Sequence, residues 1–267
     1  MRQLLGPFAA ALLLTMPACA QAPAPPSASA APDAALIDDV VVANHILYDQ
    51  GVVDGFGHVS VRSSKDASHF LMARSMAPGL VTASDILEFD LDGNAVNNPQ
   101  NRAVYLERFI HSEIYKAHPE VKAVVHSHSP SVIPFGATGV PLRPLYHMSS
   151  FLGAGVPIFE IREAGGDATD MLVRNPQLGA ALAQKLGHSS VLLMRGHGDV
   201  VVGDSVRLAV FRAIYTEINA KLEAEALRLG QVTFLNDKEA AASVATNSAL
   251  IDRAWDLWKM KAMGGRN

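Results

Sequence analysis

Apolar residues recur along this chain at two spacings, one of three to four residues and one of two. The wider spacing predicts amphipathic helices, because it gathers apolar side chains on one face. It covers residues 36–51, 102–117, 205–229 and 237–261. Two-residue alternation and short β-branched runs predict strands over residues 58–62, 69–73, 86–91, 121–125, 191–194 and 200–202. Helices separate groups of strands, which predicts an α/β domain with three α/β/α layers and a mixed sheet.

The first 34 residues have the pattern of an exported protein. Arg2, an apolar run over residues 4–15 and the small residues Ala18 and Ala20 predict a secretory signal peptide over residues 1–20. That run is too short for a membrane-spanning helix. Residues 21–34, rich in Pro, Ala and Ser, predict a flexible spacer. We therefore expect a periplasmic protein with one folded domain over residues 35–267.

Composition narrows the possible functions. Cys19 is the single cysteine, so we expect neither a disulfide nor thiol chemistry in the mature domain. One alternative stays open, in which Cys19 is the lipidated first residue of a lipoprotein; membrane contact is expected only in that case. A net charge of −4 and the lack of a basic stripe argue against nucleic-acid binding. With 49% hydrophobic and 18% charged residues, the composition is that of a globular enzyme acting on a small molecule.

Three histidines lie at the ends of two predicted strands. His126 and His128 follow the run 121–125, and alternate residues of a strand point to the same face. His197 lies between two glycines after the run 191–194, where the backbone can turn sharply. Three imidazoles with an open coordination position are typical of a catalytic metal site, and oxygen-bearing substrates suit Zn²⁺ or Mn²⁺.

Glu107 is the fourth candidate. It lies in the predicted helix before His126, with His111 one turn further along the same face. A carboxylate beside a metal can be a ligand, a general base, or both in turn. The residues alone leave other interpretations open: Glu107 as a solvated charge paired with Arg108 or His111, and the three histidines as incidental surface residues.

Several motifs in order resemble the class II aldolase/adducin family, which includes fuculose-phosphate aldolase and ribulose-phosphate 4-epimerase. These motifs are Gly57–Arg62, the turn at 85–93, the run His118–Pro130 and the segment Arg195–Gly198. The resemblance extends over about residues 36–230. It implies a mostly antiparallel sheet and a homo-oligomer, commonly a tetramer. It also makes the three histidines (His126, His128 and His197) the metal ligands, and Glu107 the catalytic acid/base.

The chain departs from that family at the substrate. The aldolases bind phosphate through two serines, which are Tyr105 and Leu106 here, and their first motif has Asn in place of His58. Tyr and Leu do not supply two compact hydroxyls, so we expect an unphosphorylated substrate. The aldolase proton donor is a tyrosine in a His-Tyr-Met stretch. The order is swapped in this chain, so Tyr146 and His147 are both candidate catalytic acids.

Other sequence motifs, including Ala73-Arg74-Ser75, more closely resemble those of decarboxylases that act on hydroxylated aromatic dicarboxylates. That branch implies substrate-binding roles for Arg74, Ser75, Arg102 and His58. The two arginines would hold a carboxylate by paired hydrogen bonds.

Retro-aldol cleavage and decarboxylation both leave an electron pair on carbon, which a divalent cation on the substrate oxygens spreads as an enolate. We therefore predict a metal-dependent carbon–carbon lyase that decarboxylates a small hydroxy-carboxylate. Two alternatives remain. The first is a retro-aldolase or epimerase acting on a sugar or hydroxy-acid. The retro-aldolase would release pyruvate or an aldehyde, and neither enzyme would release carbon dioxide. A non-catalytic binding module such as adducin would lack the metal ligands.

Overall fold

A seven-stranded mixed sheet forms the centre of the fold. The computed structural model describes residues 34–264, so the predicted signal peptide and all of the spacer except Ala34 lie outside the described residues. The strand order is β3-β2-β1-β4-β7-β6-β5, and every neighbouring pair is antiparallel except β5 and β6. The strands are β1 (His58–Arg62), β2 (His69–Ala73), β3 (Ile86–Asp90), β4 (Ala123–Ser127), β5 (Ile158–Phe159), β6 (Val191–Met194) and β7 (Gly198–Gly203).

Helices surround this sheet. The α-helices are α1 (Ala34–Asp49), α2 (Arg108–Ala117), α3 (Ile133–Ala137), α4 (Arg162–Gly165), α5 (Pro176–Leu186), α6 (Val206–Leu229), α7 (Asp237–Ser248) and α8 (Ile251–Gly264). Three 3₁₀ segments join them, η1 (Pro78–Leu80), η2 (Ala83–Asp85) and η3 (His147–Ala154). None of the helices in residues 34–264 has both the length and the apolar character needed to cross a bilayer.

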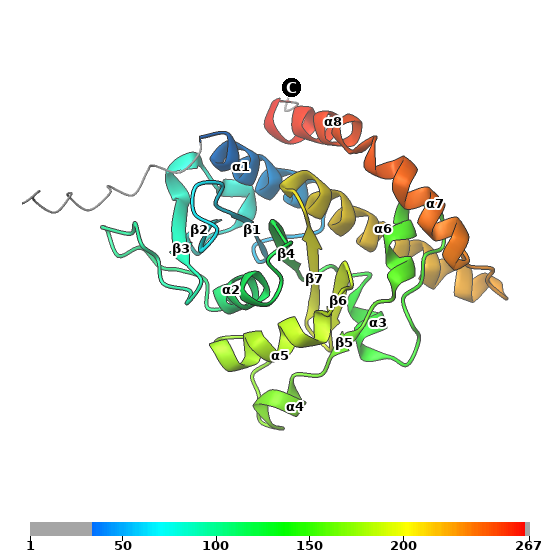
Figure 1. Ribbon diagram of the computed structural model, residues 1–267. Helices are drawn as coiled ribbons and strands as arrows, with labels where there is room; N and C mark the ends of the chain where they lie inside the picture. Colours follow the sequence, from blue (N-terminus) through cyan, green and yellow to red (C-terminus); the bar gives the residue numbers. More distant parts are fainter. Residues whose placement is uncertain (1–33, 265–267) are drawn as a thin grey trace, which may run out of the picture. The chain divides into compact units, whose positions relative to one another are not determined.

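Alternate residues of the central strands belong to two cores, one on each face of the sheet. Val59 and Val125 pack with α1 and α6. Val124 and Val200 pack with α2 and α5. Figure 1 shows α2 and α5 on one side of the sheet and α1 and α6 on the other. This alternation follows from the two-residue period of a strand, and it confirms the predicted α/β/α layers and mostly antiparallel sheet.

The helix predicted over residues 102–117 begins only at Arg108, so the prediction was wrong for its first six residues. Glu107 is the N-cap residue and not an interior one. Tertiary hydrogen bonds hold the preceding loop: the Ser75 N–H donates to the Ala103 carbonyl, and the Tyr105 hydroxyl donates to the carbonyl of Met76. These contacts replace the hydrogen bonds that a longer helix would make within itself.

The helix predicted over residues 237–261 is two helices, α7 and α8, with a break at Ala249 and Leu250. Helix α7 packs against η3, where the Asn247 amide donates to the His147 carbonyl, whereas α8 packs against α1 and α6. One straight helix could not follow both surfaces. Strand β4 lies two residues later than predicted, so His126 is inside the strand.

Candidate metal centre

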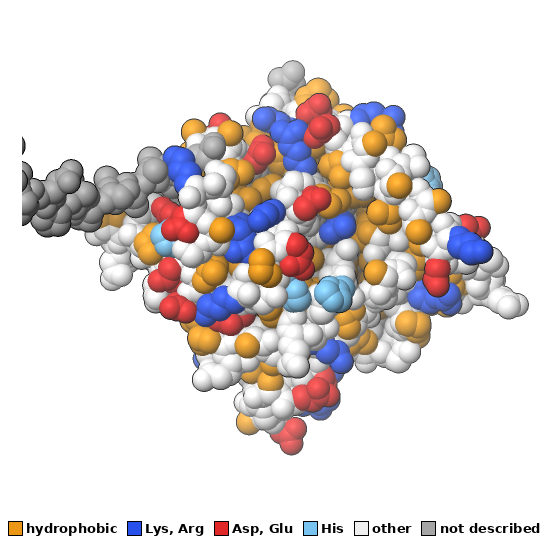
Figure 2. Space-filling model, in the orientation of Figure 1, with side chains coloured by type: hydrophobic (Ala, Val, Ile, Leu, Met, Phe, Trp, Pro, Cys, Tyr) orange, Lys and Arg blue, Asp and Glu red, His pale blue; other side chains and the backbone are white. Residues whose placement is uncertain are grey.

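The candidate metal ligands gather where the central strand β4 ends, on the face of the sheet that packs against α2. His126 lies in β4 directly opposite His58 of β1. It shares its face with Val124, so its side chain points toward α2. His128 follows the strand by one residue, and His197 lies in the turn between β6 and β7. Figure 2, in the orientation of Figure 1, shows histidine side chains reaching the surface near the middle of this view.

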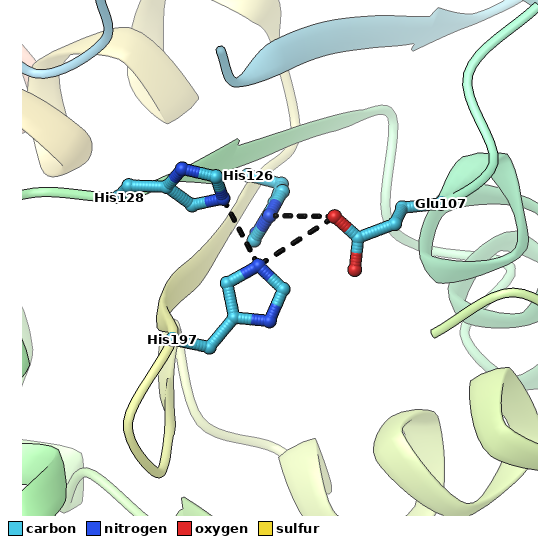
Figure 3. Close-up of side chains that lie close together, drawn as sticks. All are labelled: Glu107, His126, His128 and His197. Carbon is cyan, nitrogen blue, oxygen red and sulfur yellow. Dashed lines mark hydrogen bonds and ion pairs between the residues drawn. The ribbon is translucent and has the colours of Figure 1, made fainter. Parts of the chain in front are cut away.

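Four side chains converge there, as Figure 3 shows. One ligand atom from each of Glu107, His126, His128 and His197 lies within 4.8 Å of the others. Glu107 Oε2 is 3.4 Å from His126 Nε2 and 3.5 Å from His197 Nε2. His128 Nε2 is 2.9 Å from His197 Nε2. Two ligands of a tetrahedral ion, each at about 2.1 Å from it, lie about 3.4 Å apart, so these spacings suit one shared cation.

Hydrogen bonds on the far side of two rings orient their lone pairs. His126 Nδ1 lies 2.9 Å from the Asp199 carbonyl oxygen, and His197 Nδ1 lies 2.9 Å from that of Met171. Because a carbonyl only accepts, both Nδ1 atoms carry hydrogen and both Nε2 lone pairs face the cluster. His126 Nε2 is fully buried and has no hydrogen-bond partner among the described residues. Three imidazoles, a carboxylate and this unpaired nitrogen fit a divalent cation such as Zn²⁺.

The pKa shifts of the four side chains also suit a bound cation. Burial alone would raise the pKa of Glu107, but His126, His197 and the Val173 N–H outweigh it and lower the pKa to about 2. Burial and the charge of His126 lower the pKa of His197 to about 4, and they also lower the pKa of His128. Burial opposes charge on His126 too, yet the Glu107 carboxylate raises its pKa. These shifts favour a carboxylate at Glu107 and neutral imidazoles at His128 and His197, which are the forms that bind a cation.

Two glycines shape the turn that carries His197. Gly196 has a φ of 65°, in the left-handed region that favours glycine. A Cβ on Gly198 would lie 1.9 Å from the carbonyl oxygen of Ser127, so only glycine fits against β4 there. The Ser127 hydroxyl also donates to the Asp199 carboxylate. This close approach of β7 to β4 brings His197 beside His128.

A buried hydrogen-bonded chain lies behind His126. His58 Nδ1 is 2.6 Å from His111 Nε2, His111 Nδ1 is 2.6 Å from the Ser60 hydroxyl, and that hydroxyl is 2.7 Å from the Tyr115 hydroxyl. Burial lowers the pKa of His111 to about 3 and lowers that of His58 well below its usual value. Both rings are therefore neutral, and His58 packs against His126 with the ring centres 5.0 Å apart.

Ring contacts lead from the cluster to Tyr105, which is near one of the predicted carboxylate-binding arginines. The Tyr105 ring lies 4.5 Å from the His58 ring, and its hydroxyl donates to the Met76 carbonyl. Arg74 precedes Met76 by two residues and is close enough for its charge to act on Tyr105. Arg74 Nε donates to Asp85 Oδ1 at 2.7 Å. Its terminal nitrogens have no hydrogen-bond partner within residues 34–264, and the side chain is 33% exposed.

The other predicted site residues are placed differently. Ser75 is held by its backbone, next to Arg74. Arg102 Nη1 donates to the backbone carbonyl of Ser84 in η2. The Tyr146 ring lies 6.4 Å from that of Tyr215 on α6, and His147 lines a groove with α8. Within residues 34–264, no hydrogen bond, ion pair or ring contact joins Arg102, Tyr146 or His147 to the four converging side chains.

Sequence reasoning missed several contacts of the cluster. The Met171 carbonyl and the Val173 N–H bind His197 and Glu107, yet backbone groups leave no residue signature. Phe56, whose ring is stacked 6.2 Å from that of His128, was not among the predicted site residues. One of the open interpretations paired Glu107 with His111, but the ring nitrogens of His111 bond to His58 and Ser60.

Comparison with known proteins gives a consistent picture. Residues 38–224 match the model of the Class II Aldolase and Adducin N-terminal domain. The chain is 41% identical over 236 residues to decarboxylase tropJ of Talaromyces stipitatus, an alignment that covers 80% of this chain and 89% of that protein. It is 31% identical over 205 residues to 3,4-dihydroxyphthalate decarboxylase of Arthrobacter keyseri, covering 72% and 78%. The structure of L-fuculose 1-phosphate aldolase from Glaciozyma antarctica superposes with a TM-score of 0.71 at 24% identity, covering 86% and 90%, which shows a shared fold.

Proposed function

The chain belongs to the class II aldolase and adducin family, and we propose that it is a metal-dependent lyase that decarboxylates a small, unphosphorylated hydroxy-carboxylate. The relatives named as decarboxylases support a carboxy-lyase over an aldehyde-lyase. One of them acts, by its name, on 3,4-dihydroxyphthalate, so we take a hydroxylated aromatic carboxylate as the substrate class.

One observation carries the proposal: Glu107 Oε2 lies within 3.5 Å of the inward-facing nitrogens of both His126 and His197. This arrangement would hold one Zn²⁺ or Mn²⁺ between three imidazoles and a carboxylate. When bound, the cation would draw charge from the substrate oxygens and so stabilise the electron pair left on carbon.

The ionised state and the position of Glu107 support a role in carrying the proton in this reaction. Its pKa of about 2 makes it a carboxylate at neutral pH. The Val173 N–H holds Oε1 at 3.0 Å, which leaves Oε2 directed at the cluster. In the proposed mechanism Oε2 takes the proton of the substrate hydroxyl. Carbon dioxide then leaves, and Oε2 returns that proton to the carbon that kept the electron pair.

Arg74 is the proposed carboxylate anchor. Its Nε is fixed by Asp85, and its charge acts on Tyr105, whose ring contacts His58 beside His126; this proximity supports the anchor role. Its terminal nitrogens can then form paired, charge-assisted hydrogen bonds with a substrate carboxylate. Tyr105 and Leu106, where the aldolases have phosphate-binding serines, support an unphosphorylated substrate.

The decisive assay incubates the purified chain with Zn²⁺ or Mn²⁺ and 3,4-dihydroxyphthalate, and follows carbon dioxide release together with substrate loss. We expect equimolar carbon dioxide, activity lost on chelation and regained on adding metal. Release of pyruvate or an aldehyde without carbon dioxide would instead establish the retro-aldolase alternative. A chain that binds no divalent ion and converts no hydroxy-carboxylate would establish the binding-module alternative.

Two expectations from the sequence join this proposal: export to the periplasm and assembly as a homo-oligomer, a tetramer by family resemblance. Mass spectrometry of the protein from an exporting bacterial host tests the first, since cleavage after Ala20 leaves Gln21 as the first residue. A lipidated Cys19 at the amino terminus would show a lipoprotein, and a full-length chain would contradict export. Light scattering of the eluted protein tests the second, and a monomer would contradict it.

A further inference from the structure

The short segment Met171–Val173, between α4 and α5, contacts two members of the cluster that are 90 residues apart in the chain. The Met171 carbonyl accepts from His197 Nδ1 at 2.9 Å. Two residues later, the Val173 N–H donates to Glu107 Oε1 at 3.0 Å. In each case the bond engages the atom that is turned away from the cluster. One segment thus sets the direction of both Nε2 of His197 and Oε2 of Glu107.

The backbone of this segment is strained, and hydrogen bonds hold it in that conformation. Met171 has a φ of 73°, a left-handed conformation that residues with a Cβ rarely adopt. Such strain persists only where the surroundings impose it, and it is concentrated at functional sites. Here the Met171 N–H donates to Thr169 Oγ1 and the Leu172 N–H donates to Asp170 Oδ1, so two side-chain turns fix the conformation. The Met171 sulfur also accepts from Arg195, next to the His197 turn.

We propose that residues 171–173 form a clamp that aligns the third metal ligand, His197, with the proton carrier, Glu107. Met171 and Val173 are positioning residues that act through backbone groups alone. The metal-binding role of this cluster rests on the proposed function. Outer contacts of this kind fix the tautomer and orientation of a ligand, and their loss typically weakens metal binding about 10- to 100-fold.

Proline substitution tests the clamp, because it removes one N–H. Val173→Pro deletes the donor to Glu107, whereas Val173→Ala keeps it and shortens the side chain. Ala168→Pro, at an exposed residue of the same loop, controls for the effect of proline itself. Dissociation constants for Zn²⁺ are measured against a competing chelator, with circular dichroism confirming the fold. We expect Val173→Pro to weaken binding about 10- to 100-fold relative to Val173→Ala. Equal constants for these two variants would overturn the proposal.

A second measurement needs no substitution in the clamp, so it decides the matter even if Val173→Pro does not fold. In the metal-free, ¹⁵N-histidine-labelled chain, His197 should carry its hydrogen on Nδ1, with the signal assigned by its loss in His197→Gln. An Nε2–H tautomer would contradict the clamp. The proposed function can fail separately. If both measurements support the clamp but the chain decarboxylates no substrate, the clamp proposal stands and the lyase proposal does not.

Discussion

Gly198 and Ser127 approach so closely that a Cβ at position 198 would lie 1.9 Å from the Ser127 carbonyl oxygen. This contact joins the strand that carries His126 to the turn that carries His197. We expect Gly198→Ala to destabilise the protein by about 1–3 kcal/mol, as overpacking does, and to weaken metal binding as well. Thermal melting and Zn²⁺ titration check both effects. Gly139→Ala is the matched control, because a Cβ there meets nothing within 4 Å; equal melting temperatures would refute the tight-contact argument.

Removing a proposed metal ligand should lower the affinity for Zn²⁺ more than removing an outer contact. His126→Ala, His128→Ala and His197→Ala should each lower Zn²⁺ affinity by more than the roughly 10- to 100-fold typical of outer-contact mutations. The unaltered chain should bind one ion, as measured by elemental analysis after dialysis. His188→Ala removes an exposed histidine and should leave the ion content unchanged. Full ion content in all three ligand variants would end the metal proposal.

Glu107→Gln separates proton transfer from binding. The amide keeps an oxygen for the Val173 N–H but loses the basic oxygen at the cluster, so kcat should fall about 10²- to 10⁴-fold. Steady-state decarboxylation gives the value. Glu113→Gln serves for comparison, since Glu113 lies in α2, the helix that Glu107 precedes, and pairs with Lys116. A Glu107→Gln enzyme with unchanged kcat would assign the proton transfer elsewhere.

Arg74→Lys tests the carboxylate anchor. Lysine retains the charge but not the planar pair of donors. Losing one charge-assisted hydrogen bond, about 1.5–3 kcal/mol, should raise KM roughly 10- to 100-fold. Arg102→Lys should have a smaller effect, because Arg102 Nη1 is bonded to the Ser84 carbonyl. The reverse order of the two KM values would transfer the anchor to Arg102.

The contribution of Glu223 to stability should fall as pH rises from about 4.5 to about 7. Burial raises the pKa of this carboxyl to about 7, despite hydrogen bonds from Arg143 and Asn219. The folded protein therefore keeps a proton that the unfolded chain loses near pH 4.5. The stabilisation is complete below pH 4.5 and is lost as pH rises to 7, by up to about 3 kcal/mol.

Denaturant unfolding of Glu223→Gln from pH 4 to 8 measures that contribution. The stability of the unaltered chain relative to this variant should decline across the range. Glu225→Gln, at an exposed residue paired with Arg228, should show no such trend. A pH-independent difference for Glu223→Gln would mean that Glu223 is ionised in the folded protein.

Local patterns predicted the strands except β5, and also the long helices α1 and α6, but not α3, α4 or α5. The two-residue alternation in β1 and β4 determines which side chains face α2, so His126 and His58 had to share a face once the strands paired. The glycines around His197 likewise indicated a tight turn. The start of α2 and the break between α7 and α8 were not predictable, because tertiary contacts of the loop at Tyr105 and of Asn247 decide them.

The sequence by itself determined the layers of this protein and the three imidazoles, because side-chain type and spacing are local properties. The tertiary structure alone decided how those imidazoles are arranged and what surrounds them. In the folded protein, Glu107 precedes α2 and points toward them. The Tyr105 hydroxyl donates to the Met76 carbonyl, and the Met171 carbonyl accepts from His197. These contacts involve backbone groups and segments far apart in the chain, so no local sequence pattern predicts them.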